Sequence, residues 1–270
     1  MEFEREAMFI AIKDIVRILN EMAPPRLAEE WDNVGLQVGR NEKEVRVVLC
    51  ALDFSAEVLE QAVQHHADII VTHHPAIFRG IKQLTDRDWR TALLLEAARQ
   101  DIAVYSAHTN LDSAAGGVSD VLANLLELEN VEGLADAETL EGIGRIGVLS
   151  EEMELEAFAE TVKRVLKLEH VTVVPAGRPV QKVAVCGGSG MDFLDYAVRA
   201  GADTYVTGDV KYHDAQDARG KGINVIDATH QATELPVVNE LADRLALRLS
   251  RDGYTAKVLV AKETKLLQTL

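Results

Sequence analysis

Two adjacent histidines followed by a proline, His73-His74-Pro75, are the first residues whose types and spacing suit metal chemistry. They come directly after the apolar run Asp68–Thr72, which is typical of a β-strand. Because the proline stops strand pairing, we expect both imidazoles at the carboxyl end of that strand, where the turning chain lets them serve two neighbouring ions. Neutral imidazole is a good ligand for zinc, iron, nickel and manganese-like ions. The alternative is that one histidine caps the strand and the other is simply exposed.

A carboxylate follows the next predicted strand, Ile102–Ala107. Since parallel strands bring their carboxyl ends to one edge of a sheet, Asp112 is expected beside the histidine pair. Its two oxygens suit it to bridge two cations. His108 and Asn110 are close by in the sequence, and each is a candidate ligand, a candidate proton carrier or a residue that orients a ligand. The orienting role is favoured for both.

A further histidine and carboxylate occur in the segment Ile226–Pro236. Thr233 suits a helix N-cap and Pro236 fits only the first turn of a helix, so we expect Glu234 near a helix N-terminus and His230 in the preceding loop. Each alone has an ordinary explanation, as a loop histidine and a glutamate favoured by the helix dipole. With the first set they give three histidines and two carboxylates at strand ends, the donor set of dinuclear hydrolytic sites.

Two other polar segments are candidates for binding or catalysis. In Gly208–His213, His213 is a candidate catalytic acid or base, and Lys211 or Tyr212 a candidate contact for an anionic substrate group. A hydrogen-bonded structural turn is the alternative. Gly187–Gly190 lacks the spacing of established phosphate-binding loops, so a tight turn is favoured over a phosphate site.

The elements that must position these residues alternate between strand-like and helix-like runs from residue 46 onward. This alternation predicts an α/β fold with mixed, mostly parallel sheets flanked by helices. The predicted strands are Val47–Ala51, Asp68–Thr72, Ile102–Ala107 and Ile143–Leu149, and the predicted helices are Ala56–His66, Thr91–Arg99, Val118–Leu126, Glu154–Leu166 and Leu235–Leu247.

The sequence also resembles itself over three blocks in the same order, and each copy ends with an acid, Asp112 or Glu234, before a helix-like run. We therefore predict two similar lobes from an internal duplication, residues 1–126 and 127–270, with the metal site in the cleft between them. The part from about residue 225 is expected to pack back against the first lobe. Generic similarity among apolar strands is the alternative. The matched blocks are Arg46–Cys50 with Lys182–Cys186, Ala67–Thr72 with Ala202–Thr207, and Ile102–His108 with Ile223–His230.

Composition bounds the class of protein. Of 270 residues, 47% are hydrophobic and 27% charged, as in ordinary globular proteins. The formal charge of -16 argues against nucleic acid and anionic membrane as partners and favours attraction of cations. The N-terminal residues show no basic leader, and no apolar run reaches the ~18 residues of a membrane span. Cys50 and Cys186 each lie in an apolar run, which indicates buried thiols in a reducing compartment, so we expect a cytoplasmic protein.

Five segments spread over nearly the whole chain together resemble the Nif-three-like dinuclear-metal family, whose members are often labelled GTP cyclohydrolase 1 type 2 homologues. The resemblance implies metal ligands at His73, His74, Asp112, His230 and Glu234, and a ring-shaped homohexamer that encloses the sites. Some members carry an additional domain between the halves, for which this chain has no room. The segments are Trp31–Leu36, Thr72–Pro75, His108–Asp112, Gly208–His213 and Thr229–Glu234.

The leading functional hypothesis is a metal-dependent hydrolase. Two divalent ions (Zn, Mn, Fe, Co or Ni), held by the five ligands, would activate a shared water and clamp an oxygen of a nucleotide or another small phosphate-bearing substrate. His108 or His213 would move protons. The competing hypothesis is a non-catalytic metal-binding or regulatory protein whose ions serve storage, delivery or assembly.

Overall fold

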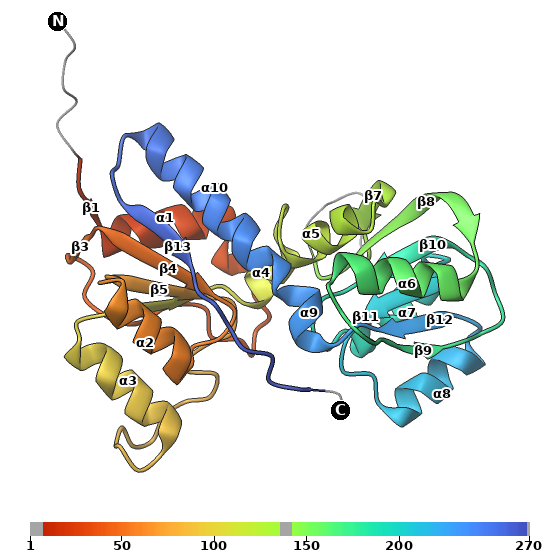
Figure 1. The fold of residues 1–270 in the computed structure, drawn as a ribbon, viewed down its shortest axis with the longest axis horizontal. Coiled ribbons are helices and arrows are strands. Elements are labelled where there is room, and N and C mark those ends of the chain that lie inside the picture. The colour runs from red at the N-terminus through yellow and green to blue at the C-terminus, as the bar shows by residue number, and fades with distance from the viewer. Residues whose placement is uncertain (1–7, 136–141, 269–270) are drawn as a thin grey trace, which may run out of the picture. The chain divides into compact units, whose positions relative to one another are not determined.

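The computed structural model describes residues 8–135 and 142–268, which form two compact units (Figure 1). Unit 1 comprises Met1–Leu111 and Val238–Leu270, and unit 2 comprises Asp112–Val237. No helix within the described residues is long and apolar enough to cross a membrane.

The boundaries of the units differ from the predicted boundary at residue 126. The helix α5 (Val118–Leu125) packs Leu122 and Ala123 into a core of unit 2, so the chain leaves unit 1 before this helix. The chain returns to unit 1 at Val238 rather than near residue 225, because β12 (Asn224–Asp227) is an inner strand of the unit 2 sheet.

Unit 1 is built on a five-stranded sheet of order β13-β4-β5-β6-β2. The first four strands run parallel, and β2 pairs antiparallel with β6. Every residue of β5 and β6 is buried, as expected for inner strands covered on both faces. The strands are β2 (Gly35–Val38), β4 (Val47–Ala51), β5 (Ile69–Thr72), β6 (Ala103–Ser106) and β13 (Lys257–Val260).

Helices cover both faces of this sheet (Figure 1). α2 and α3 pack Val58, Ala62 and Ala97 against Leu49 and Val104 on one face, and α1 and α10 lie on the other. The remaining elements are a short ladder of β1 (Ile10–Ala11) with β3 (Glu44–Val45), a 3-10 turn at Pro25–Leu27, and the helices α1 (Ile12–Met22), α2 (Ala56–Gln64), α3 (Trp89–Arg99), α4 (Thr109–Ser113) and α10 (Pro236–Asp252).

Unit 2 is built on a six-stranded sheet of order β7-β8-β10-β11-β12-β9. The mixed sheets flanked by helices are therefore confirmed, but the mostly parallel character holds only for unit 1. Only β10, β11 and β12 are parallel to one another here, because β7, β8 and β9 all pair antiparallel. The further strands are β7 (Glu129–Gly133), β8 (Arg145–Met153), β9 (Thr172–Val174), β10 (Val180–Val185) and β11 (Thr204–Thr207).

The two faces of this second sheet are distinguished by the alternation of side chains along β10. Val183 and Val185 pack with α5 and α6, whereas Ala184 packs with Leu194 of α7 and Ala218 of α8. The helices are α6 (Leu155–Val165), α7 (Leu194–Arg199), α8 (Tyr212–Gly220) and α9 (His230–Glu234), with a 3-10 turn at Met191–Phe193.

The segments that resemble each other in sequence have the same local hydrogen bonds in the two units. An aspartate just before β5 and β11 accepts bonds from two successive backbone amides near the start of the neighbouring strand. The amide of the residue directly after the following strand, β6 or β12, also donates to a threonine carbonyl. The bonds are those of Asp68 with Arg46 and Val47, Asp203 with Gln181 and Lys182, Ala107 with Thr72, and Ala228 with Thr207.

Candidate metal centre

Three histidines lie together in unit 1 at the carboxyl ends of β5 and β6, and they are termed the histidine cluster: His73, His74 and His108. One ring nitrogen from each lies within 4.8 Å of the others. β5 ends at Thr72, and the ring centroids of His73 and His74 are 5.0 Å apart. His73 is only 1% exposed. The predicted position of His73 and His74 at a strand end is therefore confirmed, and His108 lies at the same edge of the sheet.

Each histidine of the cluster has its Nδ1 atom beside a group that only accepts hydrogen bonds. Carbonyl and ionised carboxylate oxygens cannot donate, so each Nδ1 carries a proton and Nε2 is the nitrogen that would bind a metal. A histidine that binds a metal through one nitrogen typically donates from the other in this manner. The pairs are His73 with the Ala107 carbonyl at 2.9 Å, His74 with Asp53 at 2.8 Å, and His108 with Asp32 at 2.8 Å.

The carboxylate behind His108 is itself fixed in the ionised form. Burial favours the neutral form of Asp32, but hydrogen bonds from the His108 ring and from Thr109 outweigh it and hold the pKa of Asp32 well below its usual range. The Thr109 amide donates to it at 3.0 Å. Asp32 belongs to the segment Trp31–Leu36 that carried the family resemblance, and the structure gives its carboxylate this orienting role.

The described residues of unit 2 hold a second set of donors, termed the acidic cluster: Asp112, His230 and Glu234. A carboxylate oxygen of Asp112 lies within 4.8 Å of one of Glu234, whose side chain is almost fully buried. His230 repeats the pattern of the other histidines, because its Nδ1 is 2.8 Å from the Asp209 carboxylate. Its Nε2 lies 3.1 Å from Oε2 of Glu234.

The donor atoms of the acidic cluster fit a bound cation. A lone pair of His230 faces a carboxylate oxygen of Glu234, which is repulsive unless a proton or a cation lies between them. With metal–ligand bonds of about 2.1 Å, neighbouring ligand atoms around one ion lie about 3.0 to 3.4 Å apart, which agrees with the observed spacing. Two carboxylates at such close range also need a compensating positive charge.

The nearby cysteine remains a thiol. Burial and the charges of Asp112 and Glu234 raise the pKa of Cys186 to about 12, so its sulfur stays protonated at neutral pH. Cys50 is buried as well, with its pKa raised by burial to about 12. The prediction of two buried thiols is confirmed.

The helix that carries His230 and Glu234 begins earlier than the sequence indicated. Thr229 is the N-cap of α9, and its side chain accepts a bond from the Ala232 amide, so His230 is the first helical residue and not part of a loop. Thr233 is instead buried, donates to the His230 carbonyl at 2.8 Å and accepts from the Gly188 amide at 2.9 Å. The predicted N-cap at Thr233 is therefore wrong, because its hydroxyl is used inside the turn.

The glycine-rich segment Gly187–Gly190 is a tight turn, as favoured from its spacing. The amides of Gly188 and Gly190 donate to the hydroxyls of Thr233 and Thr207, so both are used within the unit. Gly188 has a φ of +65°, and a Cβ there would lie 2.1 Å from Oε1 of Glu234. The missing side chain thus makes room for a carboxylate of the acidic cluster.

In the segment Gly208–His213, Asp209 is bonded to His230 of the acidic cluster, whereas Lys211, Tyr212 and His213 lie at the start of α8. Lys211 is the N-cap of that helix, its backbone amide donates to the Asp214 carboxylate at 3.2 Å, and Tyr212 is 75% exposed. His213 is exposed, and its Nδ1 lies 3.0 Å from the amide oxygen of Gln216. The roles of Lys211, Tyr212 and His213 stay predictions.

Among the other residues near the two clusters, Asn110 has a structural role, and two orienting carboxylates were not identified from the sequence. Asn110 is buried and donates to the Ala23 carbonyl at 2.7 Å, so it ties α4 to the end of α1. Asp53 and Asp209, which orient His74 and His230, had no predicted role. The available signal was their position, since Asp53 closely follows a predicted strand and Asp209 closely follows the block Ala202–Thr207, which matches another.

Comparisons with known proteins agree with this fold. A protein of Clostridium perfringens named GTP cyclohydrolase 1 type 2 homolog is 34% identical over 257 residues, which cover 94% of this chain and 97% of the relative. A crystal structure of a Bacillus cereus protein related to NIF3 has a TM-score of 0.92 at 27% identity and covers 98% of this chain and 100% of that one. Reduced HcgD from Methanocaldococcus jannaschii has a TM-score of 0.81 at 32% identity, over 96% of this chain and 100% of that one.

The family model described as Duf34/NIF3 (NGG1p interacting factor 3) matches residues 10–265. This match includes every residue of the histidine cluster and of the acidic cluster. Taken with the relatives that share about a third of its residues over nearly their whole length, it shows that the chain belongs to the Duf34/NIF3 family.

Proposed function

We propose that this protein is a metal-dependent hydrolase that acts on a nucleotide or another small phosphate-bearing molecule. In this proposal His73, His74, Asp112, His230 and Glu234 would hold two divalent ions. The observation that carries it is the shared state of the histidines, each with its Nδ1 bonded to an oxygen that accepts hydrogen bonds. Metal-binding histidines need this arrangement, and ordinary surface histidines do not.

The proposal joins the two clusters through the chain itself. His108 of the histidine cluster is four residues before Asp112 of the acidic cluster, and the short helix α4 spans the interval. One turn of helix therefore links the two sets of donors, which supports one dinuclear centre rather than two separate ones.

The protein residues would complete the chemistry around the ions. When bound, two such ions lower the pKa of a shared water toward neutrality and withdraw charge from a substrate oxygen. His108 would accept the proton of that water at Nε2, because its Nδ1 proton is already bonded to Asp32. The ionised Asp32 would then stabilise the imidazolium, as the buried aspartate does in hydrolases with a catalytic triad.

Two broader features complete the proposal. We infer that the two units arose by internal duplication, which the equivalent bonds of Asp68 and Asp203 support. We also infer a homohexamer, supported by the resemblance to the family, in which case light scattering should give about six times the chain mass of 29.6 kDa.

Turnover tests the proposed function directly. Protein loaded in turn with Mn, Zn, Fe, Co or Ni should hydrolyse at least one member of a panel of nucleotides and phosphoesters, and the rate should disappear on chelation and return with metal. Ion release should be followed by mass spectrometry in the same samples. Full metal occupancy without turnover on any member of the panel would instead support the non-catalytic metal-binding role.

The orienting carboxylates should tune the affinity for metal. In Asp53→Asn, the amide group can donate to Nδ1 of His74 and so favour the tautomer in which Nε2 is protonated and cannot bind. We expect metal affinity to fall by about ten- to a hundredfold, the range for residues that orient ligands. Competition with a chromophoric chelator measures it. Asp243→Asn, the same change at an exposed site of α10, is the matched control, and equal affinities for the two variants would contradict the role of Asp53.

A further inference from the structure

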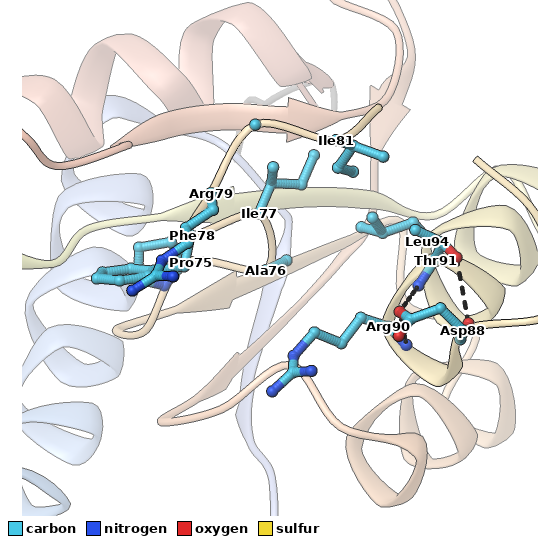
Figure 2. A pocket seen from close by; sticks show the side chains of 11 residues that line it. Pro75, Ala76, Ile77, Phe78, Arg79, Ile81, Asp88, Arg90, Thr91 and Leu94 are labelled. Atoms are coloured by element: carbon cyan, nitrogen blue, oxygen red, sulfur yellow. Dashed lines mark hydrogen bonds between the residues drawn. The ribbon is translucent and has the colours of Figure 1, made fainter. Parts of the chain in front are cut away.

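A pocket of about 520 Å³ lies in unit 1 directly beyond the histidine pair (Figure 2). It is lined by residues 75–81 and by the start of α3, and its first lining residue, Pro75, follows His74 in the chain. Ile77, Ile81 and Leu94 give it an apolar wall. The volume is in the range of sites that bind small molecules.

Two arginines line this pocket, Arg79 and Arg90. Neither guanidinium forms an ion pair with any residue in the parts of the chain described, although the protein carries a net charge of -16. The Arg90 guanidinium lies 4.3 Å from the centre of the Trp89 ring, and Figure 2 shows it extended away from α3. Because neither guanidinium is paired with a carboxylate of the described residues, the N–H groups of both arginines can donate to an anion in this pocket.

The one acidic side chain among the lining residues is already used. The Asp88 carboxylate accepts bonds from the amides of Arg90 and Thr91 at 3.0 and 3.2 Å, as the N-cap of α3 (Figure 2). Its charge is therefore offset by the helix N-terminus. The side chains that line the pocket therefore carry a net positive charge, which comes from the two arginines.

An exposed aromatic pair connects this pocket with the histidine cluster. Phe78 lines the pocket, and its ring centroid is 5.8 Å from that of Trp31 and 6.2 Å from that of His108. Phe78 is 48% exposed and Trp31 is 59% exposed. Large aromatic side chains are normally buried, so such a pair beside polar groups marks a surface for a planar ligand.

The backbone that carries Phe78 and Arg79 is fixed by two polar side chains. Asn33 donates to the Ile77 carbonyl at 2.5 Å, and Gln37 accepts from the Ile77 amide at 2.7 Å. The side-chain amides of Asn33 and Gln37 are thereby both bonded to the backbone of Ile77. The pocket wall is held in place before any ligand arrives, which lowers the entropy cost of binding.

We propose that this pocket binds the phosphate of a nucleotide through Arg79 and Arg90, with the base against Phe78 and Trp31. Guanidinium forks match phosphate oxygens in geometry and charge, and aromatic rings stack on bases. The proposal deepens the proposed function, on which it rests, by assigning where the substrate is held beside the histidine cluster.

Binding to metal-free protein tests the pocket independently of hydrolysis. Whole protein dialysed against EDTA is titrated with guanosine 5′-monophosphate and with guanosine by calorimetry. We expect the monophosphate to bind more tightly than the nucleoside. Arg79→Gln and Arg90→Gln should each weaken binding of the monophosphate by about tenfold, the value of a charge-assisted hydrogen bond, and leave guanosine binding unchanged.

A neighbouring arginine provides the matched control. Arg99→Gln changes an exposed arginine in the last turn of the same helix, paired with Glu96, and should leave both affinities unchanged. Equal affinity for the monophosphate and the nucleoside, or an equal loss in Arg99→Gln, overturns the proposal. Because no metal is present, a failure of metal-dependent hydrolysis leaves this result intact, and failure of nucleotide binding leaves metal binding intact.

Discussion

Glu234→Gln is expected to remove stoichiometric metal from the acidic cluster. The carboxylate is 4% exposed and lies 3.1 Å from Nε2 of His230, so its charge would act on a bound cation with little screening by water. Glutamine keeps the shape but removes that charge. We expect a loss of affinity above about a hundredfold, larger than for a residue that only orients a ligand. Metal content per chain after gel filtration, measured by plasma mass spectrometry, reports it.

The matched control makes the same chemical change on the exposed face of the next helix. Glu240→Gln should retain the full metal content, because Glu240 lies on the solvent side of α10. If Glu234→Gln binds as much metal as Glu240→Gln does, Glu234 is not a ligand and the proposed dinuclear centre loses its second carboxylate.

Arg145→Leu is expected to have the largest effect on folding. Arg145 is fully buried in β8, where it pairs with Asp120 and donates to the carbonyls of Gly142 and Gly144 at 2.7 and 2.9 Å. Leucine would leave Asp120 as a poorly compensated charge. We expect unit 2 to lose about 3 to 5 kcal/mol of its free energy of unfolding, the usual cost of breaking a buried pair. Hydrogen exchange of the β10 amides measures this.

A second change separates the lost charge from the lost packing. Adding Asp120→Asn to the Arg145→Leu variant removes the uncompensated charge and should recover part of the stability. Arg164→Leu, on the exposed side of α6, should stay within about 0.5 kcal/mol of the parent protein. A similar loss in Arg164→Leu would show that the effect is not specific to the buried pair.

The parts of the fold that sequence predicted best are those with continuous apolar runs. Val47–Ala51 is β4 to the residue, and the helix ending near His66 ends at Gln64, because His66 takes a positive φ of 53°. Inner parallel strands are apolar throughout, which is a strong local signal.

The edge strands were harder to predict because their residues carry little such signal. Gly35–Val38 and Thr172–Val174 form β2 and β9 with partly exposed side chains, and their place is set by pairing partners far away in the sequence. The C-terminal strand β13 has only exposed or partly buried side chains and pairs with β4, about 210 residues earlier. Long-range pairing of this kind is not encoded in local periodicity.

The candidate site shows the same division between local and long-range information. His73 and His74 were found because the strand and the proline that position them are their neighbours. The residues that orient them come from elsewhere in the chain, Asp53 from the end of β4 and Ala107 from the end of β6. A sequence can indicate a pair of candidate ligands, but the residues that orient them depend on which strands lie side by side.

Ribosomal synthesis delivers all of unit 2 before unit 1 is complete, because Asp112–Val237 is continuous whereas unit 1 also needs the chain from Val238 onward. The Glu263 carboxylate accepts bonds from the amides of Leu52 and Asp53 at 2.6 and 2.9 Å, across some 210 residues of sequence. Asp53 in turn holds His74. His74, a proposed ligand, therefore reaches its final orientation only after Glu263 has been synthesised. The growing chain cannot arrange all the proposed ligands before then.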